Sequence, residues 1–326
     1  MAEWCNKINP TLLTLILFVS CTKQEKFDPL LINTTSFDVV LSVEFSPSAF
    51  EVDSEGFYYL ANSADGSIKK FDKRGSLIAS AGRFGQGPGE YAELQPIKIC
   101  VSRNRVYAYN IGHMFVHVYS KDLDFKETIS LEYPLLDMRS IDDEFFLFSY
   151  IAMSQDDKNF EVMGRNYEKS TNIHFQISRS NHRNFYFRNI RFVTPLTDGM
   201  YLKSYAYVNS NSIYNINGEL IKNFKIPGYP DQISDFLDSE FSPPPGMEAP
   251  EFSLISQVIY DSKNEEIMIL EGDYSEYLSE RIHAFTISGD YLYTRKLPEK
   301  VDFIAVQNGI LYGLVRRDER VDIVYF

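Results

Sequence analysis

A strand–turn–strand phrase recurs along this chain and constrains its fold more than any other feature. In each copy an apolar run leads into an Asp/Asn/Gly turn, a second run ends near Asn, and a third run carries aromatic residues and Lys. The clearest copies occupy residues 50–77 and 97–119. A repeat of this length and strand content is typical of β-propellers, in which each repeat forms one blade. The phrase therefore predicts an all-β ring of blades.

Six copies can be distinguished along the chain. They occupy residues 47–79, 96–131, 135–177, 192–220, 258–292 and 303–326. Turn pairs such as Asn217-Gly218 separate the runs, because Asn and Gly tolerate the positive φ that two-residue hairpins need. Helical periodicity is weak throughout, and residues 233–241 are expected to form at most one helical turn. We expect six blades, and a seventh within residues 159–191 is the alternative that the pattern leaves open.

The sixth copy lacks an outer strand, because the chain stops at Phe326. A suitable strand, residues 37–45, precedes the first copy. In a closed ring this strand completes the last blade and removes the exposed edge that would otherwise promote aggregation. We therefore predict a six-bladed β-propeller over residues 37–326, its last blade closed by the N-terminal strand.

The composition agrees with this fold and excludes some partners. The 326 residues include 25 Phe and 22 Tyr, which favour strands. The net charge of −13 argues against nucleic acid as a partner, because phosphates require a basic surface. It also argues against electrostatic adsorption to anionic lipid. We interpret the acidity as a source of solubility and expect the protein to be a monomer.

A short apolar run, residues 12–19, precedes the repeats. It is too short to span a bilayer as a mature helix and fits the core of a signal peptide. Residues 17–21 read Leu-Phe-Val-Ser-Cys and resemble the bacterial lipobox, which implies removal of residues 1–20 and acylation of Cys21. Residues 21–36 would then be a tether. An ordinary cleaved signal and an uncleaved anchor are the alternatives.

This interpretation places the protein in the cell envelope, held by the lipid on Cys21 at a membrane, most simply the outer membrane, with the domain facing the periplasm or the surface. Several acyl chains on one cysteine give stable anchoring. Cys5 would leave with the signal, and Cys100 lies in an apolar strand pattern that predicts burial without a disulfide partner. The cysteines form no CxxC motif or Cys/His cluster, so a structural zinc site is not expected.

One stretch between the first two repeats carries a family resemblance. Residues 84–91 read Phe-Gly-Gln-Gly-Pro-Gly-Glu-Tyr and are followed by Pro96 and two Tyr-rich strands. They resemble the NHL-type repeats of the TolB-like, six-bladed propeller lipoproteins of Bacteroidota. The resemblance implies a rigid disc, a lipid anchor and a binding role. It is close over residues 50–120, although Asn62 and Asn110 stand where many such repeats have Asp.

The same connector supplies the candidate binding residues. Its Gly-Gln-Gly-Pro-Gly run lacks the Lys-Ser/Thr of a phosphate-binding loop, so we interpret the glycines as permitting a tight crossing between blades, which Pro88 stiffens. The flanking polar and aromatic side chains are the ones available to a groove. They are Arg83, Gln86, Glu90 and Tyr91.

No catalytic or metal-ligating residue stands out. His113 and His117 share a face if their strand is regular, but a metal would need further ligands. We expect His174, His182 and His283 to lie at non-equivalent repeat positions, which argues against a ring of histidines. The candidate carboxylates are Glu51, Asp53, Asp142, Asp143, Asp261 and Asp302. Nothing selects a triad among them, since turn carboxylates usually cap turns, and no nucleophile-elbow motif is present.

The functional prediction follows from these features. We expect a cell-envelope lipoprotein whose propeller is a non-catalytic binding or scaffold module for protein or glycan, without a cofactor. The alternative is a metal-dependent hydrolase or lyase that uses Asp, Glu or Asn in the central channel. Residues 154–170 and 228–252 break the repeat, and they are expected either to shape one mouth of the ring or to be disordered.

Overall fold

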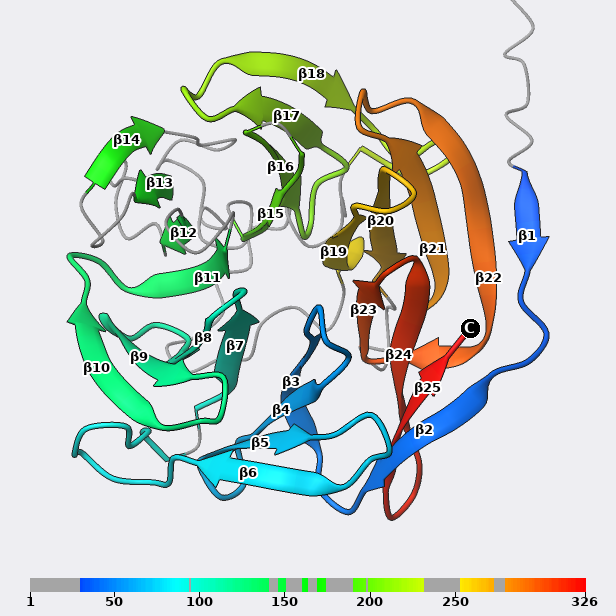
Figure 1. The fold of residues 1–326 in the computed structure, drawn as a ribbon. Helices are drawn as coiled ribbons and strands as arrows, with labels where there is room; N and C mark the ends of the chain where they lie inside the picture. The colour runs from blue at the N-terminus through cyan, green and yellow to red at the C-terminus, as the bar shows by residue number, and fades with distance from the viewer. Residues whose placement is uncertain are drawn as a thin grey trace, which may run out of the picture.

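The computed structural model describes residues 30–93, 95–140, 146–150, 160–163, 169–173, 190–197, 199–231, 253–272 and 279–326. Within these ranges every regular element is a β-strand, and the strands form six sheets. Figure 1 shows the sheets arranged around a common centre as the blades of a propeller. Among these residues no helix has the length and apolar character needed to cross a membrane. The predicted all-β, six-bladed fold is confirmed.

Each blade contains four antiparallel strands, and in the first five blades the chain runs through these four strands from the centre to the rim. The first blade contains β3 (Pro47–Val52), β4 (Tyr58–Asn62), β5 (Ser67–Phe71) and β6 (Leu77–Ala81). The second contains β7 (Ile97–Val101), β8 (Arg105–Asn110), β9 (Phe115–Ser120) and β10 (Phe125–Ser130). The third contains β11 (Leu135–Ser140), β12 (Phe146–Tyr150), β13 (Phe160–Met163) and β14 (Lys169–Ile173).

The remaining blades use both ends of the domain. The fourth contains β15 (Arg191–Pro195), β16 (Met200–Tyr205), β17 (Asn211–Asn215) and β18 (Leu220–Phe224). The fifth contains β19 (Ile255–Asp261), β20 (Glu266–Glu271), β21 (Ser279–Thr286) and β22 (Tyr291–Val301), with β1 (Leu31–Asn33) at its outer edge. The sixth contains β23 (Phe303–Gln307), β24 (Ile310–Arg316), β25 (Val321–Tyr325) and β2 (Asp38–Val43).

The innermost strands form a closed ring. Contacts join β3 to β7, β7 to β11, β11 to β15, β15 to β19, β19 to β23, and β23 back to β3. The described part of residues 159–191 supplies β13 and β14 of the third blade. A seventh blade at this place is therefore wrong for the residues that the structure describes. The predicted helical turn at residues 233–241 lies outside them.

The predicted closure is confirmed. Strand β2 pairs antiparallel with β25, so that Leu41 lies opposite Ile323 and Val43 opposite Val321. The Ser42 hydroxyl donates to Asp322 Oδ1 at 2.6 Å. Leu41 and Val43 are each only 6% exposed and pack in a cluster that also contains Phe50 of the first blade. The N-terminal strand thus joins the sixth blade to the first.

Strand β1 extends the ordered chain beyond the predicted domain boundary. It pairs parallel with β22, Leu31 opposite Thr294, and it lies within the stretch 21–36 that we expected to be a tether. Its three residues are exposed. Figure 1 shows β1 and β2 running along the outside of the ring beside β22 and β25.

The hydrophobic core lies between the faces of neighbouring blades. One cluster joins blades one and two, another joins two and three, and two more join blade five to its neighbours. Second strands are covered on both faces, and all five residues of β4 are buried. This explains why those strands read as continuous apolar runs with Tyr. Cys100 is buried and free, as predicted.

Candidate binding site in the central channel

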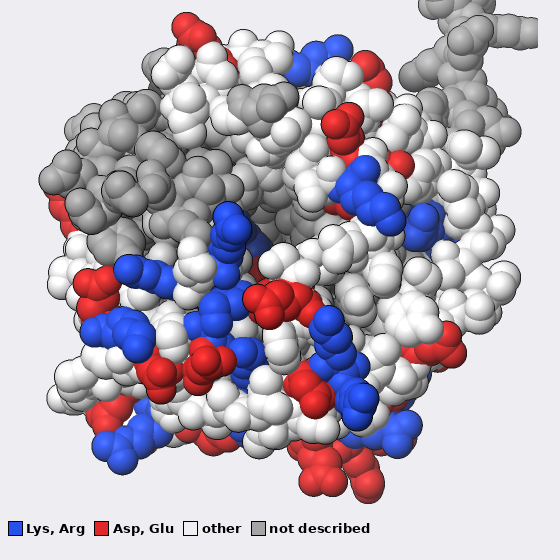
Figure 2. Space-filling model, in the orientation of Figure 1, with Lys and Arg blue, Asp and Glu red and all other residues white. Residues whose placement is uncertain are grey.

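The innermost strands enclose two cavities in the channel. The larger, about 290 Å³, lies at the side where these strands begin, and the smaller, about 170 Å³, lies at the side where they end. Glu51, Arg139 and Gln257 line both. These three residues therefore mark the boundary between the two cavities. Figure 2 shows one face of the disc, on which basic and acidic side chains are interspersed around a central hollow.

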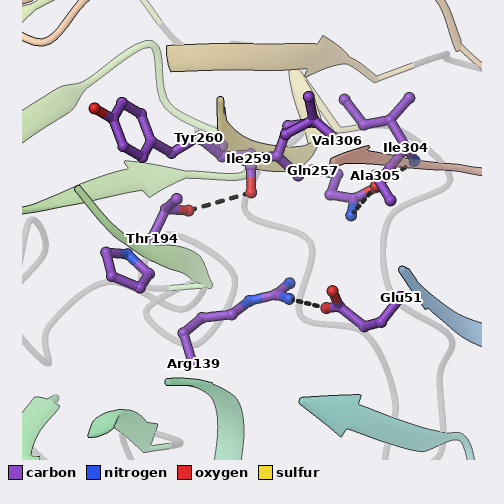
Figure 3. Close-up of a pocket in the computed structure, with 11 residues that line it drawn as sticks. Glu51, Arg139, Thr194, Gln257, Ile259, Tyr260, Ile304, Ala305 and Val306 are labelled. Carbon is purple, nitrogen blue, oxygen red and sulfur yellow. Dashed lines mark hydrogen bonds and ion pairs between the residues drawn. The ribbon is translucent and has the colours of Figure 1, made fainter. Parts of the chain in front are cut away.

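An ion pair crosses the channel at this boundary. Arg139 Nη1 of β11 lies 2.5 Å from Glu51 Oε1 of β3, and the two strands belong to the third and first blades. Figure 3 shows the Arg139 side chain extended toward Glu51. Burial raises the pKa of Glu51, and Arg139 offsets only part of that effect. Burial alone would lower the pKa of Arg139, but the carboxylates of Asp137 and Glu51 outweigh it and raise that pKa.

Lys98 and Asp137 occupy the larger cavity. Lys98 Nζ lies 5.3 Å from the centre of the Phe303 ring, and burial lowers its pKa, an effect that Asp137 partly offsets. Asp137 Oδ1 accepts a hydrogen bond from the Tyr109 hydroxyl at 3.4 Å and lies 3.7 Å from Arg139 Nε. Asp137 Oδ2 is buried without a hydrogen-bond partner. Such an atom is costly unless a ligand or water satisfies it.

A third basic group, Arg191, lies at the wall of this cavity. The residue is 1% exposed, and its Nη2 donates to the backbone oxygen of Tyr150 at 3.2 Å. Burial lowers its pKa to about 10, so the guanidinium keeps its charge at neutral pH. The larger cavity thus contains three basic and two acidic groups. Its apolar wall consists of Ala49, Phe50, Ile99, Ile111, Leu136, Ile190, Phe192 and Phe303.

Side-chain bonds to backbone hold the channel wall in place. Gln257 Nε2 donates to Ile304 O at 2.8 Å, and Ile304 N donates back to Gln257 Oε1 at 2.7 Å. The Thr194 hydroxyl donates to Val258 O at 3.2 Å. These bonds join β15, β19 and β23, as Figure 3 shows. The cavities are therefore lined by strands that are fixed to their neighbours before any ligand binds.

The connector residues predicted from sequence lie away from the channel. Arg83 Nη2 and Glu90 Oε1 form an ion pair at 2.6 Å, and Glu90 Oε2 accepts from the Gly87 amide at 2.7 Å. Tyr91 is fully buried, with its hydroxyl 2.9 Å from that of Tyr119. Gln86 is exposed and lines a separate hollow of about 520 Å³ with Glu90. A binding role for these four residues stays a prediction.

The conformational role predicted for the connector glycines is confirmed at Gly89. Its φ is +74°, and an added Cβ would lie 3.1 Å from the Phe125 ring and 3.3 Å from the Tyr119 hydroxyl. A left-handed backbone next to two aromatic side chains favours Gly strongly. The crossing between the first and second blades therefore depends on this residue.

His117 fixes this connector to the second blade. Its Nε2 lies 2.9 Å from Glu90 O and its Nδ1 lies 2.9 Å from the Thr128 hydroxyl. A carbonyl only accepts, so Nε2 carries the proton and Nδ1 accepts from Thr128. Both ring nitrogens are thus engaged within the protein. His113, the other member of the predicted pair, packs its ring against Phe115 at 5.2 Å.

The expectation that His283 occupies a non-equivalent position is wrong. His283 lies opposite Thr294 in the fifth blade as His117 lies opposite Thr128 in the second, with Nδ1 to hydroxyl distances of 2.9 Å in both. Each imidazole also meets the edge of a tyrosine, Tyr229 or Tyr91, from the incoming connector. The equivalence of the two histidines is hidden in the sequence because the connectors that precede them differ in length. The shared spacing of eleven residues between His and Thr would have revealed it.

The other predicted carboxylates have structural roles. Asp53 Oδ1 accepts from the amides of Glu55 and Phe57, and Asp261 Oδ1 accepts from that of Lys263, so both cap turns. Asp302 pairs with Arg316 at 2.6 Å. Asp142, Asp143, His174 and His182 lie outside the described residues. In the ranges that the structure describes, no group of three His, Cys, Asp or Glu side chains is arranged to hold a metal.

Sequence inspection missed four of the charged channel residues. Glu51 was among the candidates, but Lys98, Asp137, Arg139 and Arg191 were not. Each lies on an innermost strand whose other residues are largely apolar. These residues could have been identified as charged residues in the first strand of a repeat, because the first strand of each blade faces the channel.

Comparison with known proteins supports the fold. The model of the DUF5128 family, described as a six-bladed β-propeller, matches residues 49–227. No curated protein matches the chain. A catalytically inactive variant of virginiamycin B lyase from Staphylococcus aureus, solved with quinupristin, is 11% identical with a TM-score of 0.57, over 89% of this chain and 100% of that one. A Bacteroides fragilis protein described as exported is 13% identical with a TM-score of 0.56, over 91% and 98%. At these identities the likeness shows the fold alone.

Proposed function

The chain belongs to the DUF5128 family of six-bladed β-propellers, and we propose that it is a non-catalytic binding module whose ligand enters the larger channel cavity. The observation that carries this proposal is the cavity of about 290 Å³ with Lys98, Asp137 and Arg191 in its wall. Ligand sites commonly have this size and combine apolar walls with a few fixed polar groups. Charged groups held out of water are costly to a fold, and their concentration in one cavity favours a function.

The arrangement of charges favours binding over metal-dependent catalysis. Asp137 and Glu51 are the carboxylates of the cavity, and both lie against the Arg139 guanidinium. A metal ion that used these two groups would lie beside the Arg139 guanidinium, whose positive charge would repel it. The likeness to virginiamycin B lyase concerns the fold alone. A lyase activity is therefore a second candidate function that is supported only by the shared architecture.

A comparison of blocked and open channels tests the binding module. A soluble form of the protein beginning at Phe27 is used to capture partners from cell-envelope extracts, alongside Ile111→Trp, which fills the cavity, and Leu77→Trp, which enlarges an exposed side chain on β6. We expect the unaltered protein and Leu77→Trp to retain the same protein or glycan, and Ile111→Trp to lose it. Equal capture by all three would contradict the proposal.

We further propose that the protein is exported and anchored in the cell envelope by lipid on Cys21. The support is the lipobox-like leader, together with the likeness in fold to a Bacteroides protein described as exported. Cys21→Ala should release the protein from the membrane fraction. The matched control is Cys5→Ala, which alters a cysteine of the leader and should leave the protein bound. Membrane binding by Cys21→Ala would show the anchor to be wrong.

A further inference from the structure

We infer that the larger channel cavity binds a small zwitterion with an apolar body, such as the free form of a short apolar peptide. Its carboxylate would meet Lys98, and its ammonium group would meet Asp137. This inference rests on the proposed binding function and assigns the chemical class of the ligand. It is carried by the presence of Lys98, Asp137 and an apolar wall in one cavity.

The Lys98 ammonium can bind an anionic group of the ligand. Lys98 forms no ion pair within 4 Å among the described residues, and its ammonium is stabilised by the Phe303 ring at 5.3 Å. Arg191 adds a second cation, whereas the charge of Arg139 is balanced by Glu51 at 2.5 Å. A ligand carboxylate would gain a charge-assisted hydrogen bond with Lys98, in a site that excludes much of the water.

Asp137 Oδ2 can accept a hydrogen bond from the ligand. Asp137 Oδ1 is used by Tyr109, whereas Oδ2 is buried with no donor among the described residues. An unsatisfied carboxylate oxygen in a cavity selects a ligand with an N–H or O–H group. A protonated amine is the donor that best fits a carboxylate, because it also neutralises the negative charge.

The apolar lining of the cavity determines the chemical character of the part of the ligand between its two charges. Four of the six innermost strands contribute apolar side chains that surround the charged groups, namely Phe50, Ile99, Phe192 and Phe303. Ile111, in the turn between β8 and β9, completes this wall. A polar ligand such as a sugar would leave its hydroxyl groups without partners against this wall. An apolar side chain between an ammonium and a carboxylate matches the wall and both charges.

The test uses phenylalanyl-leucine as the probe, with its C-terminal amide and its N-acetyl derivative. Binding to the soluble protein is followed by calorimetry. We expect the free dipeptide to bind about 10- to 100-fold more tightly than either blocked form, as for hydrogen bonds to charged groups. Lys98→Met should abolish the preference over the amide and keep that over the N-acetyl form. Asp137→Asn should do the reverse, and the surface control Lys263→Met should change neither.

The outcomes separate this inference from the proposed function. Equal binding of free and blocked dipeptides, or a preference that survives Lys98→Met, would overturn the zwitterion assignment. If the dipeptide fails to bind while capture from envelope extracts still depends on an open cavity, the ligand class is wrong and the binding module stands. Thermal unfolding checks the variants, since Lys98→Met removes a charge that burial disfavours and should not lower the unfolding temperature.

Discussion

Leu41→Ala tests the closure of the ring at a single side chain. Leu41 is 6% exposed on β2 and packs with Phe50 of the first blade and Ile323 of the sixth. Leu→Ala at buried sites costs about 2–5 kcal/mol. We expect a loss of about 2–3 kcal/mol in the free energy of unfolding, because an outer strand can move to fill part of the cavity.

Val39→Ala is the matched control, because Val39 lies on the same strand but is 49% exposed. Its effect should stay within about 0.5 kcal/mol. Both variants are measured by urea unfolding of the soluble protein, followed by circular dichroism, with the midpoints compared at unchanged slope. Equal effects at Leu41 and Val39 would mean that β2 does not pack in the ring, and would refute the closure.

Three further predictions concern the blades. Burial alone would raise the pKa of Asp53, but Lys121 at 2.8 Å and two backbone amides outweigh it and lower that pKa. Asp53 therefore stabilises the fold fully above its unfolded pKa, and this contribution is lost as the pH falls through its lower, folded pKa. Asp53→Asn should cost about 1–3 kcal/mol at pH 7 and progressively less at acidic pH, measured by urea unfolding. Thr128→Val removes the bond to His117 and should cost about 1 kcal/mol in the same assay. Thr294→Val removes bonds to both His283 and Tyr291 and should cost more, so a smaller loss at Thr294 would argue against the equivalence. Burial raises the pKa of Cys100 to about 12, so iodoacetamide at pH 8 should leave it unmodified in the native protein and label it in urea, as mass spectrometry would show.

The blades could be predicted because short sequence patterns define their strands. The closure could be predicted because the strand missing from the last repeat is present near the N-terminus. Alternating apolar residues and Asn-Gly turns define strands over a few positions, and the unpaired last repeat called for a strand that residues 37–45 could supply. The core between blades follows from the same pattern, since second strands such as β4 are apolar on both faces.

The channel site could not be predicted in the same way, because its members meet only when the ring closes. Glu51 and Arg139 are 88 positions apart and belong to non-adjacent blades. Lys98 in an otherwise apolar strand looks like any solvent-facing lysine until its strand is placed at the centre. The polar residues of the connector were predicted to bind a ligand. In the structure, however, Arg83 and Glu90 form an ion pair with each other.

Site-specific photo-crosslinking in cells tests most directly where the ligand binds. A photoreactive amino acid is placed at Ile111, in the wall of the larger cavity, or at Leu77, on the exposed strand β6. The channel account predicts a cross-linked product from position 111 and none from position 77. A product from position 77 alone would contradict it and place the binding surface on the rim of the disc.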